Sequence, residues 1–138
     1  VLKALDDRKL SDNTLVLFTS DNGGLATLEG MTFAPTTNAP LREGKGFLYE
    51  GGVRVPLVAR WPGAIRPGTT TDEVANSNDL FDTILEATER GAKEQLAVAG
   101  PRRDGRSLLP IFAGTKMKEW PVFWHYPHYS NQGGKPGG

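Results

Sequence analysis

The sequence predicts an α/β fold that contains part of a mainly parallel sheet. Three segments carry this prediction: a helical pattern over residues 1–9, an unbroken apolar run over 15–18, and a second apolar segment over 53–61. An apolar run without polar alternation is typical of a strand buried on both faces of a parallel sheet. The succession of helix, short loop and apolar strand is typical of α/β proteins.

Charge and composition exclude several functional classes. The 138 residues are enough for one domain, and the 16 basic residues balance the 16 acidic ones. No block of one charge favours nucleic-acid binding, and no apolar run approaches the roughly 18 residues of a membrane span. Because the chain contains no cysteine, these residues form neither disulfides nor thiolate metal sites and supply no cysteine nucleophile.

The N-terminal elements follow from apolar spacing and from the residues that interrupt it. Apolar residues within 1–5, followed by charged ones at 6–9, predict the last turns of a helix, which the polar residues 11–13 end. Residues 15–18 then form the first strand. The next segment, 23–46, is a long loop rich in Gly, Pro, Thr and Asn. Loops of this length inside compact proteins are often functional.

The second strand and the C-terminal part follow from the same reasoning. Pro56 interrupts the strand at 53–61 and fits an edge, a bulge or a strand start. A helix is predicted over about 79–90, with Asn78 or Asp79 as its N-cap. The remaining predictions are an exposed polar connection over 91–106, a short helix within 105–114, a strand over 121–129 and a tail over 130–138 that does not fold alone.

The polar stretch "SDNGG" after the first strand is a candidate metal site. Ligands of open α/β sheets bind at the carboxyl ends of strands, where Asp21 and Asn22 lie. A carboxylate and an amide carbonyl offer two hard oxygen ligands of the kind that bind Ca²⁺ or Mg²⁺. Gly23 and Gly24 would let the backbone turn away from the ion. An Asx turn is the alternative, and these four residues alone favour it.

The stretch "LREGKGFLYEGGVRVP" over 41–56 is a candidate anion site. Lys45 lies between two glycines, which would let its ammonium group reach an anion without crowding. A solvated loop lysine is the plain alternative, and Lys45 taken by itself favours it. Glu50 and Arg54 are four residues apart, and an ion pair that braces a turn is the preferred interpretation for them rather than catalysis.

The stretch "WHYPHY" contains the only two histidines, His125 and His128. Two such ligands are too few for a closed zinc site. The neighbouring aromatic residues Trp124, Tyr126 and Tyr129 could stack on a sugar or aryl group, or they could pack in the core. The residues themselves leave both interpretations open.

Four segments in this order resemble the later portion of a type I, formylglycine-dependent sulfatase of the alkaline phosphatase superfamily. They are "NTLVLFTSDNGG", "LREGKGFLYEGGVRVPLVARWPG", "NSNDLFDTILEA" and "DGRSLLPIFAG", and with their spacing they cover nearly the whole chain. The pair of "SDNG" and "GKG…YEGGVRVP" at this separation is highly specific. The resemblance implies a partial alkaline-phosphatase-like fold, with about 1–90 in the main α/β sheet and about 91–138 in a connection and the start of a smaller C-terminal subdomain.

The resemblance also implies roles for the candidate residues. Asp21 and Asn22 would be two ligands of the active-site divalent cation, which is usually Ca²⁺ in this family. Lys45 would contact the sulfate group and help to neutralise charge that develops at the leaving oxygen. Glu50 and Arg54 would hold the loop that carries Lys45.

The resemblance is incomplete at the nucleophile. The family's Cys/Ser-x-Pro-x-Arg motif, whose Cys or Ser becomes formylglycine, does not occur here. We therefore expect a C-terminal fragment that starts at Val1 in the middle of a helical pattern, with the nucleophile and the other metal ligands upstream, and no hydrolysis by the fragment alone. Asp82 stands where the family often has Pro, which puts no chemistry in doubt.

The substrate expected from the resemblance is a sulfate ester on a small molecule or a carbohydrate, with His125 or His128 reaching its leaving group or sugar. Related phosphonate and phosphate monoester hydrolases, which also bind a tetrahedral anion beside divalent metal, are one alternative. A non-catalytic binding or self-associating module is another, because a truncated sheet would leave unpaired strand edges and uncovered apolar surface. By resemblance alone, the compartment is periplasmic or secreted.

Overall fold

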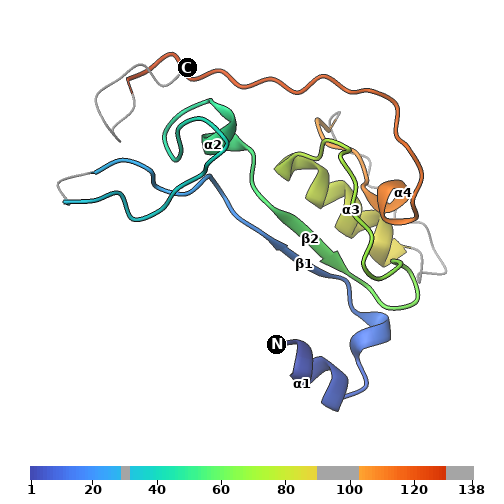
Figure 1. Ribbon diagram of the computed structural model, residues 1–138. Coiled ribbons are helices and arrows are strands. Elements are labelled where there is room, and N and C mark those ends of the chain that lie inside the picture. Colours follow the sequence, from blue (N-terminus) through green and yellow to red (C-terminus); the bar gives the residue numbers. More distant parts are fainter. Residues whose placement is uncertain (29–31, 90–102, 130–138) are drawn as a thin grey trace. The chain divides into compact units, whose positions relative to one another are not determined.

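The computed structural model describes residues 1–28, 32–89 and 103–129. The chain divides into two compact units, of which unit 1 contains Val1–Val16 and Ala59–Val122 and unit 2 contains Leu17–Val58 and Phe123–Gly138. Figure 1 shows the elements in chain order: α1 (Leu2–Asp7), η1 (Ser11–Asn13), β1 (Val16–Thr19), α2 (Glu50–Val53), β2 (Leu57–Arg60), α3 (Ser77–Glu89) and α4 (Leu109–Phe112). Within these described residues, no helix has both the length and the apolar character that crossing a bilayer requires.

The two predicted strands are present as β1 and β2, which pair in one sheet. Their arrows point in opposite directions in Figure 1, so this pair is antiparallel, whereas the sheet predicted from the sequence is mainly parallel without a direction for this pair. The cause lies in the loop between them. Thr19 Oγ1 donates to Pro56 O (2.9 Å) and Gly23 N donates to Gly52 O (2.9 Å), which makes the chain turn back along itself.

The predicted burial of residues 15–18 on both faces is wrong. The side chain of Phe18 on β1 is 66% exposed, and that of Val58 on β2 is 56% exposed. Two strands alone cannot cover the two faces of a sheet, and each strand has a single neighbour among the described residues. Apolar side chains of both strands therefore remain in contact with solvent.

The strand predicted over 53–61 is shorter than expected. β2 begins at Leu57, so Pro56 stands at the strand start, which is one of the three positions considered for it. Val53 instead ends the helical turn α2. This turn brings backbone against backbone, because a Cβ added at Gly52 would lie 2.0 Å from Phe47 O. An extended strand cannot make that approach.

The N-terminal helix of unit 1 is present as α1, and the residues predicted to end it form the short η1 helix. Ser11 Oγ donates to the carboxylate of Asp6, and Arg60 approaches the same carboxylate at 3.2 Å. The Ser11 hydrogen bond, followed by the attraction of Arg60, lowers the pKa of the Asp6 carboxyl below its usual value. Trp61 Nε1 donates to Asp12 O (3.0 Å), so the segment after β2 is tied to η1.

The predicted central helix is present as α3, but its N-cap is neither Asn78 nor Asp79. Asn76 precedes the first helical residue, and its Oδ1 accepts from Asn78 N (3.0 Å). Asp79 Oδ2 accepts from Asn76 N (2.8 Å) in return. This reciprocal pair is a capping box, which satisfies backbone N–H groups that the first helical turn leaves free. Asn76 is therefore the N-cap, and Asp79 occupies the third helical position.

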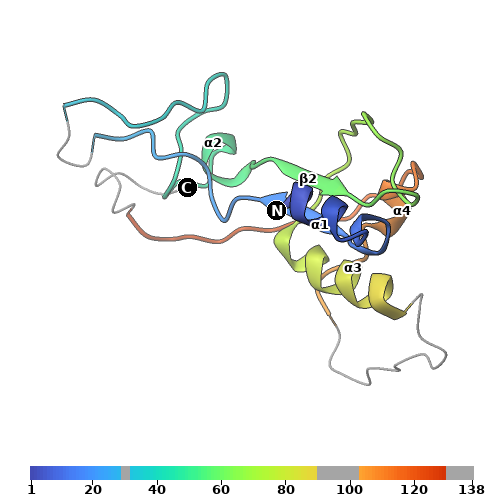
Figure 2. The same ribbon diagram turned by 90° about the horizontal axis from the view of Figure 1, so that it is seen from below.

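The short helix predicted within 105–114 is present as α4, and it lies beside α3 in the views of Figure 1 and Figure 2. The buried Thr83 of α3 joins them: its Oγ1 donates to Asp79 O (2.6 Å) and accepts from Leu108 N (2.8 Å). Leu108 and Leu109 supply the buried apolar contact of this unit. Asp82 of α3 forms an ion pair with Arg103, which ties the segment before α4 to the helix.

In the described part of the predicted exposed connection, residues 103 and 104 are exposed as expected, whereas residues 105 and 106 are partly enclosed. Arg106 N donates to Asp79 Oδ1 (2.9 Å), and a Cβ added at Gly105 would lie 2.2 Å from Asn78 O.

The strand predicted over 121–129 is wrong, because residues 121–127 belong to no strand. Pro121 and Pro127 have no backbone N–H to donate to a ladder. Residues 91–102 and the predicted tail lie outside the described residues, and the division near residue 90 stays a prediction.

Candidate functional site

The DNGG tip (residues 21–24) follows β1 in unit 2. Ser20 Oγ donates to Asn22 O (2.8 Å), and Asn22 Nδ2 donates to Gly23 O (3.0 Å), so the tip has the local hydrogen bonds of a polar turn. The Asp21 side chain is exposed and makes no hydrogen bond or ion pair with a described residue. The side-chain oxygen of Asn22 is equally uncommitted among these residues. The turn and the candidate site are therefore compatible, because the turn uses the nitrogen of Asn22 and leaves both sets of oxygens open.

Glycine contacts join this tip to the lysine loop (residues 42–52). Gly23 N donates to Gly52 O (2.9 Å), and Gly51 N donates to Arg42 O (2.8 Å). A Cβ added at Gly23 would lie 1.7 Å from Gly51 O, and one at Gly51 would lie 2.1 Å from Glu43 O. Three stretches of backbone thus touch where any side chain would separate them. This packing is the physical reason why the two glycine-rich motifs occur together in the sequence.

Lys45 is held beside the tip by its backbone. Its N–H donates to Gly24 O (3.1 Å), and a Cβ added at the buried Gly44 would lie 2.2 Å from the same oxygen. The side chain of Lys45 is exposed and has no ion-pair partner among the described residues. Gly44 thus serves close backbone packing and Gly46 adopts a positive φ of 90°, while the ammonium group stays available to an anion.

Glu50 and Arg54 form the predicted ion pair across α2, with Arg54 Nη1 3.2 Å from Glu50 Oε2. Their side chains are 60% and 65% exposed, and an exposed pair of this kind contributes about 0–1 kcal/mol. Arg54 N also donates to Glu50 O (2.8 Å). The pair therefore braces the turn that carries Gly51 and Gly52 and adds little stability to the chain.

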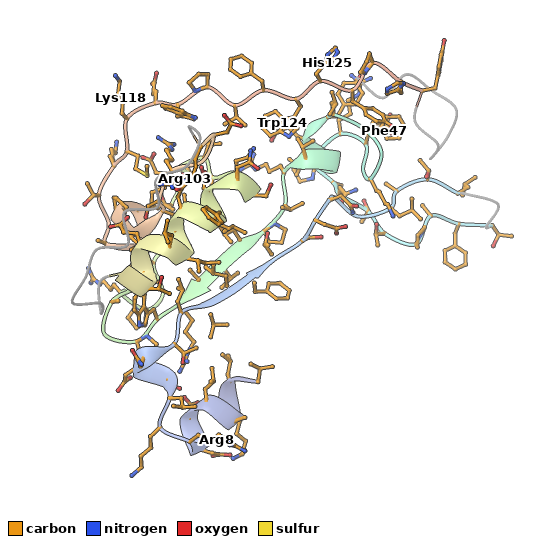
Figure 3. All side chains as sticks on the ribbon, turned by 180° about the vertical axis from the view of Figure 1, so that it is seen from behind. Arg8, Phe47, Arg103, Lys118, Trp124 and His125 are labelled. Carbon is orange, nitrogen blue, oxygen red and sulfur yellow. The ribbon has the colours of Figure 1, made fainter. Side chains whose placement is uncertain are left out.

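The two histidines lie in the extended segment at residues 123–129. Both side chains are exposed, and Figure 3 shows His125 and its neighbour Trp124 projecting from opposite sides of the segment. His128 packs edge-on against Tyr126, with ring centroids 5.5 Å apart. Trp124 is 52% exposed and Tyr129 is 73% exposed, so the core role considered for them is wrong in this structure. No described hydrogen bond joins either histidine to the DNGG tip or the lysine loop.

The donor set of the tip fits part of a Ca²⁺ site. Asp21 supplies a free carboxylate and Asn22 a free amide oxygen, which are the hard oxygen ligands that Ca²⁺ prefers. Calcium takes six to eight oxygen ligands, so these residues can supply only a share of them. No group of three His, Cys, Asp or Glu side chains able to hold a metal occurs within 1–28, 32–89 and 103–129. The site is therefore incomplete in the described part of the chain.

Sequence reasoning missed two residues that shape this site. Asn38 makes three side-chain hydrogen bonds to the tip and the lysine loop, and Arg42 lies over the ring of Tyr49 with its Cζ 3.7 Å from the ring centroid. Asn38 is one of several polar residues in a long loop, and its position relative to the other candidate residues follows no known motif. No sequence pattern therefore pointed to it. The aromatic ring seven residues after Arg42 was the only signal for the second contact.

The architecture and the comparisons together define the class of this protein: it is a partial α/β unit of the alkaline-phosphatase-like fold. The structure of the PsFucS1 sulfatase from Pseudoalteromonas sp. matches 86% of the chain with a TM-score of 0.66 and 30% sequence identity. The structure of Ps i-CgsB in complex with k-i-k-neocarrahexaose matches 82% of it with a TM-score of 0.65 and 32% identity.

Sequence comparison gives the family. A model of the family described as "Sulfatase" matches residues 1–90, so the chain belongs to the sulfatase family, and it corresponds to a C-terminal portion. A protein named "Sulfatase" from Formosa agariphila is 37% identical over an alignment of 145 positions that covers 94% of the chain. The N-acetylgalactosamine-6-sulfatase of Canis lupus familiaris is 34% identical over 125 residues, which cover 91% of it.

The matched portion is a small part of those proteins. The chain spans 24% of the Formosa agariphila protein, 23% of the canine enzyme and 23% of each of the two solved structures. The activity, substrate and partners of those proteins are properties of chains about four times as long.

Proposed function

We propose that the chain contributes part of the active site of a sulfuric ester hydrolase. The observation that carries the proposal is the backbone junction of Gly23 with Gly52 and of Lys45 with Gly24. This junction presents an uncommitted carboxylate and an uncommitted ammonium group from two neighbouring loops of one unit. A sulfate ester needs both kinds of group: oxygen ligands for a metal that polarises the sulfate, and a cation for its negative charge.

The proposed roles follow from the chemistry of each side chain. Asp21 and Asn22 would hold Ca²⁺ through oxygen atoms, and the ion would supply Lewis-acid polarisation of the sulfate oxygens. Lys45 would bind the sulfate group and stabilise charge on the leaving oxygen. Glu50 and Arg54 would keep the lysine loop in its turn. The formylglycine expected of this family would lie outside these residues and would supply the nucleophile.

A carbohydrate sulfate is the proposed substrate class. Support comes from the names of two similar proteins, an N-acetylgalactosamine-6-sulfatase and a protein solved with k-i-k-neocarrahexaose. His125 and His128 stand in an exposed aromatic segment, and such a segment can stack on sugar rings while its imidazoles form hydrogen bonds. The periplasm or the extracellular space is the proposed compartment.

We call the longer sulfatase of which this chain would form a part the full-length parent. Turnover of an aryl sulfate by this parent and by its variants tests the proposal. Lys45→Met should lower kcat by about 100- to 1000-fold, because it removes a fixed charge at a developing anion. Lys45→Arg should restore part of the loss, and Lys3→Met, which removes an exposed lysine of unit 1, should leave kcat unchanged. The 138-residue chain alone should show no turnover.

Three results would contradict the proposal. The first is full activity of Lys45→Met, and the second is turnover by the short chain at the parental rate. The third is a parent that hydrolyses an aryl phosphate or phosphonate in preference to the sulfate, which would favour the related phosphorus-ester hydrolases instead.

A further inference from the structure

We infer that Asn38 is a positioning residue that fixes Lys45 relative to the DNGG tip. The inference rests on the proposed function, since it assigns a residue to the same site. Asn38 lies within the long loop between β1 and α2 and is half-buried. Its side-chain amide reaches both segments that carry the candidate residues, and it does so through backbone groups.

The side-chain amide of Asn38 and the backbone of Gly24 form two reciprocal hydrogen bonds. Asn38 Oδ1 accepts from Gly24 N (3.0 Å), and Asn38 Nδ2 donates to Gly24 O (2.8 Å). One side-chain amide thus satisfies the donor and the acceptor of one residue, as a neighbouring strand would. The same nitrogen also donates to Glu43 O (3.0 Å) in the lysine loop. The three hydrogen bonds tie the tip and the loop through a single side chain.

The position of Lys45 depends on the same carbonyl. Gly24 O accepts from Lys45 N (3.1 Å) as well as from Asn38 Nδ2. Gly24 lies three residues after Asp21, so a shift of its peptide changes the separation of the candidate metal ligand and the candidate sulfate-binding lysine. Among the described residues, Asn38 makes no hydrogen bond to Asp21, to Asn22 or to the ammonium group of Lys45, so it acts through Gly24.

The backbone of Glu43 shows that the loop is held in an unfavourable conformation. Its φ is 58°, and this left-handed region is unfavourable for a residue other than glycine. Such conformations persist where the surroundings determine them, and the carbonyl of Glu43 is bonded by Asn38 Nδ2. A Cβ added at Gly44 would lie 2.6 Å from Asn38 Nδ2, so the amide also fills the space beside the residue that precedes Lys45.

Only a side-chain amide of this length can serve all three bonds. Asn38→Asp keeps the size and the acceptor, but it loses both donated bonds and sets a carboxylate against Gly24 O and Glu43 O. Asn38→Ala removes every contact. Thr36→Val is the matched control, because it deletes one hydrogen bond across the same loop, from Thr36 Oγ1 to Leu25 O (2.7 Å), and no side-chain hydrogen bond to Gly24 or Glu43. The isosteric valine also keeps the packing of residue 36 beside Gly24.

Amide hydrogen exchange of the 138-residue chain tests whether Asn38 holds Lys45 in position, and this measurement needs no enzymatic activity. In Asn38→Asp and Asn38→Ala, exchange at Lys45 N–H should rise by about tenfold over wild type, because Gly24 O is no longer held in place. Thr36→Val should leave this rate unchanged. Leu108 N–H, which donates to the buried Thr83 of unit 1, should keep its protection in every variant and report that the chain is folded. Unchanged exchange at Lys45 N–H in both Asn38 variants would overturn the inference.

Kinetics of the full-length parent test the consequence for the site. Asn38→Asp should lower kcat on an aryl sulfate by about 10- to 100-fold, the loss expected from misplaced catalytic groups, while Thr36→Val stays near wild type. Equal kcat for Asn38→Asp and Thr36→Val in an active parent would overturn the inference and leave the proposed function standing. If the wild-type parent shows no turnover, the proposed function fails, and hydrogen exchange alone decides whether Asn38 holds Lys45.

Discussion

At the scale of single residues, the site depends on glycines that allow backbones to touch. Gly23, Gly44 and Gly51 each lie where a Cβ would come within 2.2 Å of the carbonyl oxygen of a residue that is distant in the sequence. The sequence predicted that Gly23 would let the chain turn beside an ion. It could not predict that Gly23 packs on Gly51, because that contact joins residues far apart in the chain and has no local signal.

Gly23→Ala should destabilise the chain by about 3 kcal/mol, the upper end of the usual cost of overpacking. The added methyl group would lie 1.7 Å from Gly51 O, so the tip and the lysine loop must separate. Gly63→Ala is the matched control: its Cβ meets nothing within 4 Å, so only its positive φ contributes a cost, of about 1 kcal/mol. Urea unfolding of both variants measures the difference, and equal costs would show that the glycine contact is absent.

At the scale of elements, local sequence was sufficient where one segment decides its own structure. The apolar spacing of α3 and the short stretch of α4 identified both helices. Helix ends were harder, because the cap of α3 is Asn76 and its partner is the acid three residues later. The sequence "NSND" contains that spacing, but Asn78 and Asp79 are equally good capping residues by type. The direction of β2 was out of reach, since it is set by loop contacts between β1 and α2.

The capping box predicts which asparagine stabilises α3. Asn76→Ala should cost about 1 kcal/mol, because it removes the acceptor for Asn78 N at the start of the helix. Asn78→Ala should cost much less, since the side chain of Asn78 makes no hydrogen bond in the described residues. Chemical denaturation followed by far-ultraviolet circular dichroism measures both. A larger loss of unfolding free energy in Asn78→Ala than in Asn76→Ala would show that Asn78, one of the two N-caps predicted from the sequence, is the N-cap.

At the scale of the whole chain, much apolar surface remains exposed in the described residues. Among the described residues, the buried apolar side chains are few, namely Phe47 in unit 2 with Leu108 and Leu109 in unit 1. Both strands of the sheet have one neighbour each and carry exposed apolar side chains. Unpaired edges and uncovered apolar surface favour association between chains, so we propose that the 138-residue chain self-associates through its strands.

Val58→Lys should weaken this association, because a charge on a strand opposes pairing with another chain. Val74→Lys is the matched control: Val74 is 59% exposed against 56% for Val58, but it lies outside the strands. Size-exclusion chromatography with light scattering should show a mass above that of the monomer for wild type and for Val74→Lys, and a lower mass for Val58→Lys. A wild-type chain that stays monomeric at every concentration would refute association.

We propose that Asp21 and Asn22 are ligands of a Ca²⁺ site that these residues only partly supply. Calorimetric titration of the full-length parent and of the 138-residue chain with Ca²⁺ tests it most directly. The parent should bind one ion tightly, Asp21→Ala should weaken that binding by at least about tenfold, and the chain alone should bind weakly or not at all. Tight stoichiometric binding by the chain alone, or unchanged affinity of the parent with Asp21→Ala, would contradict the account.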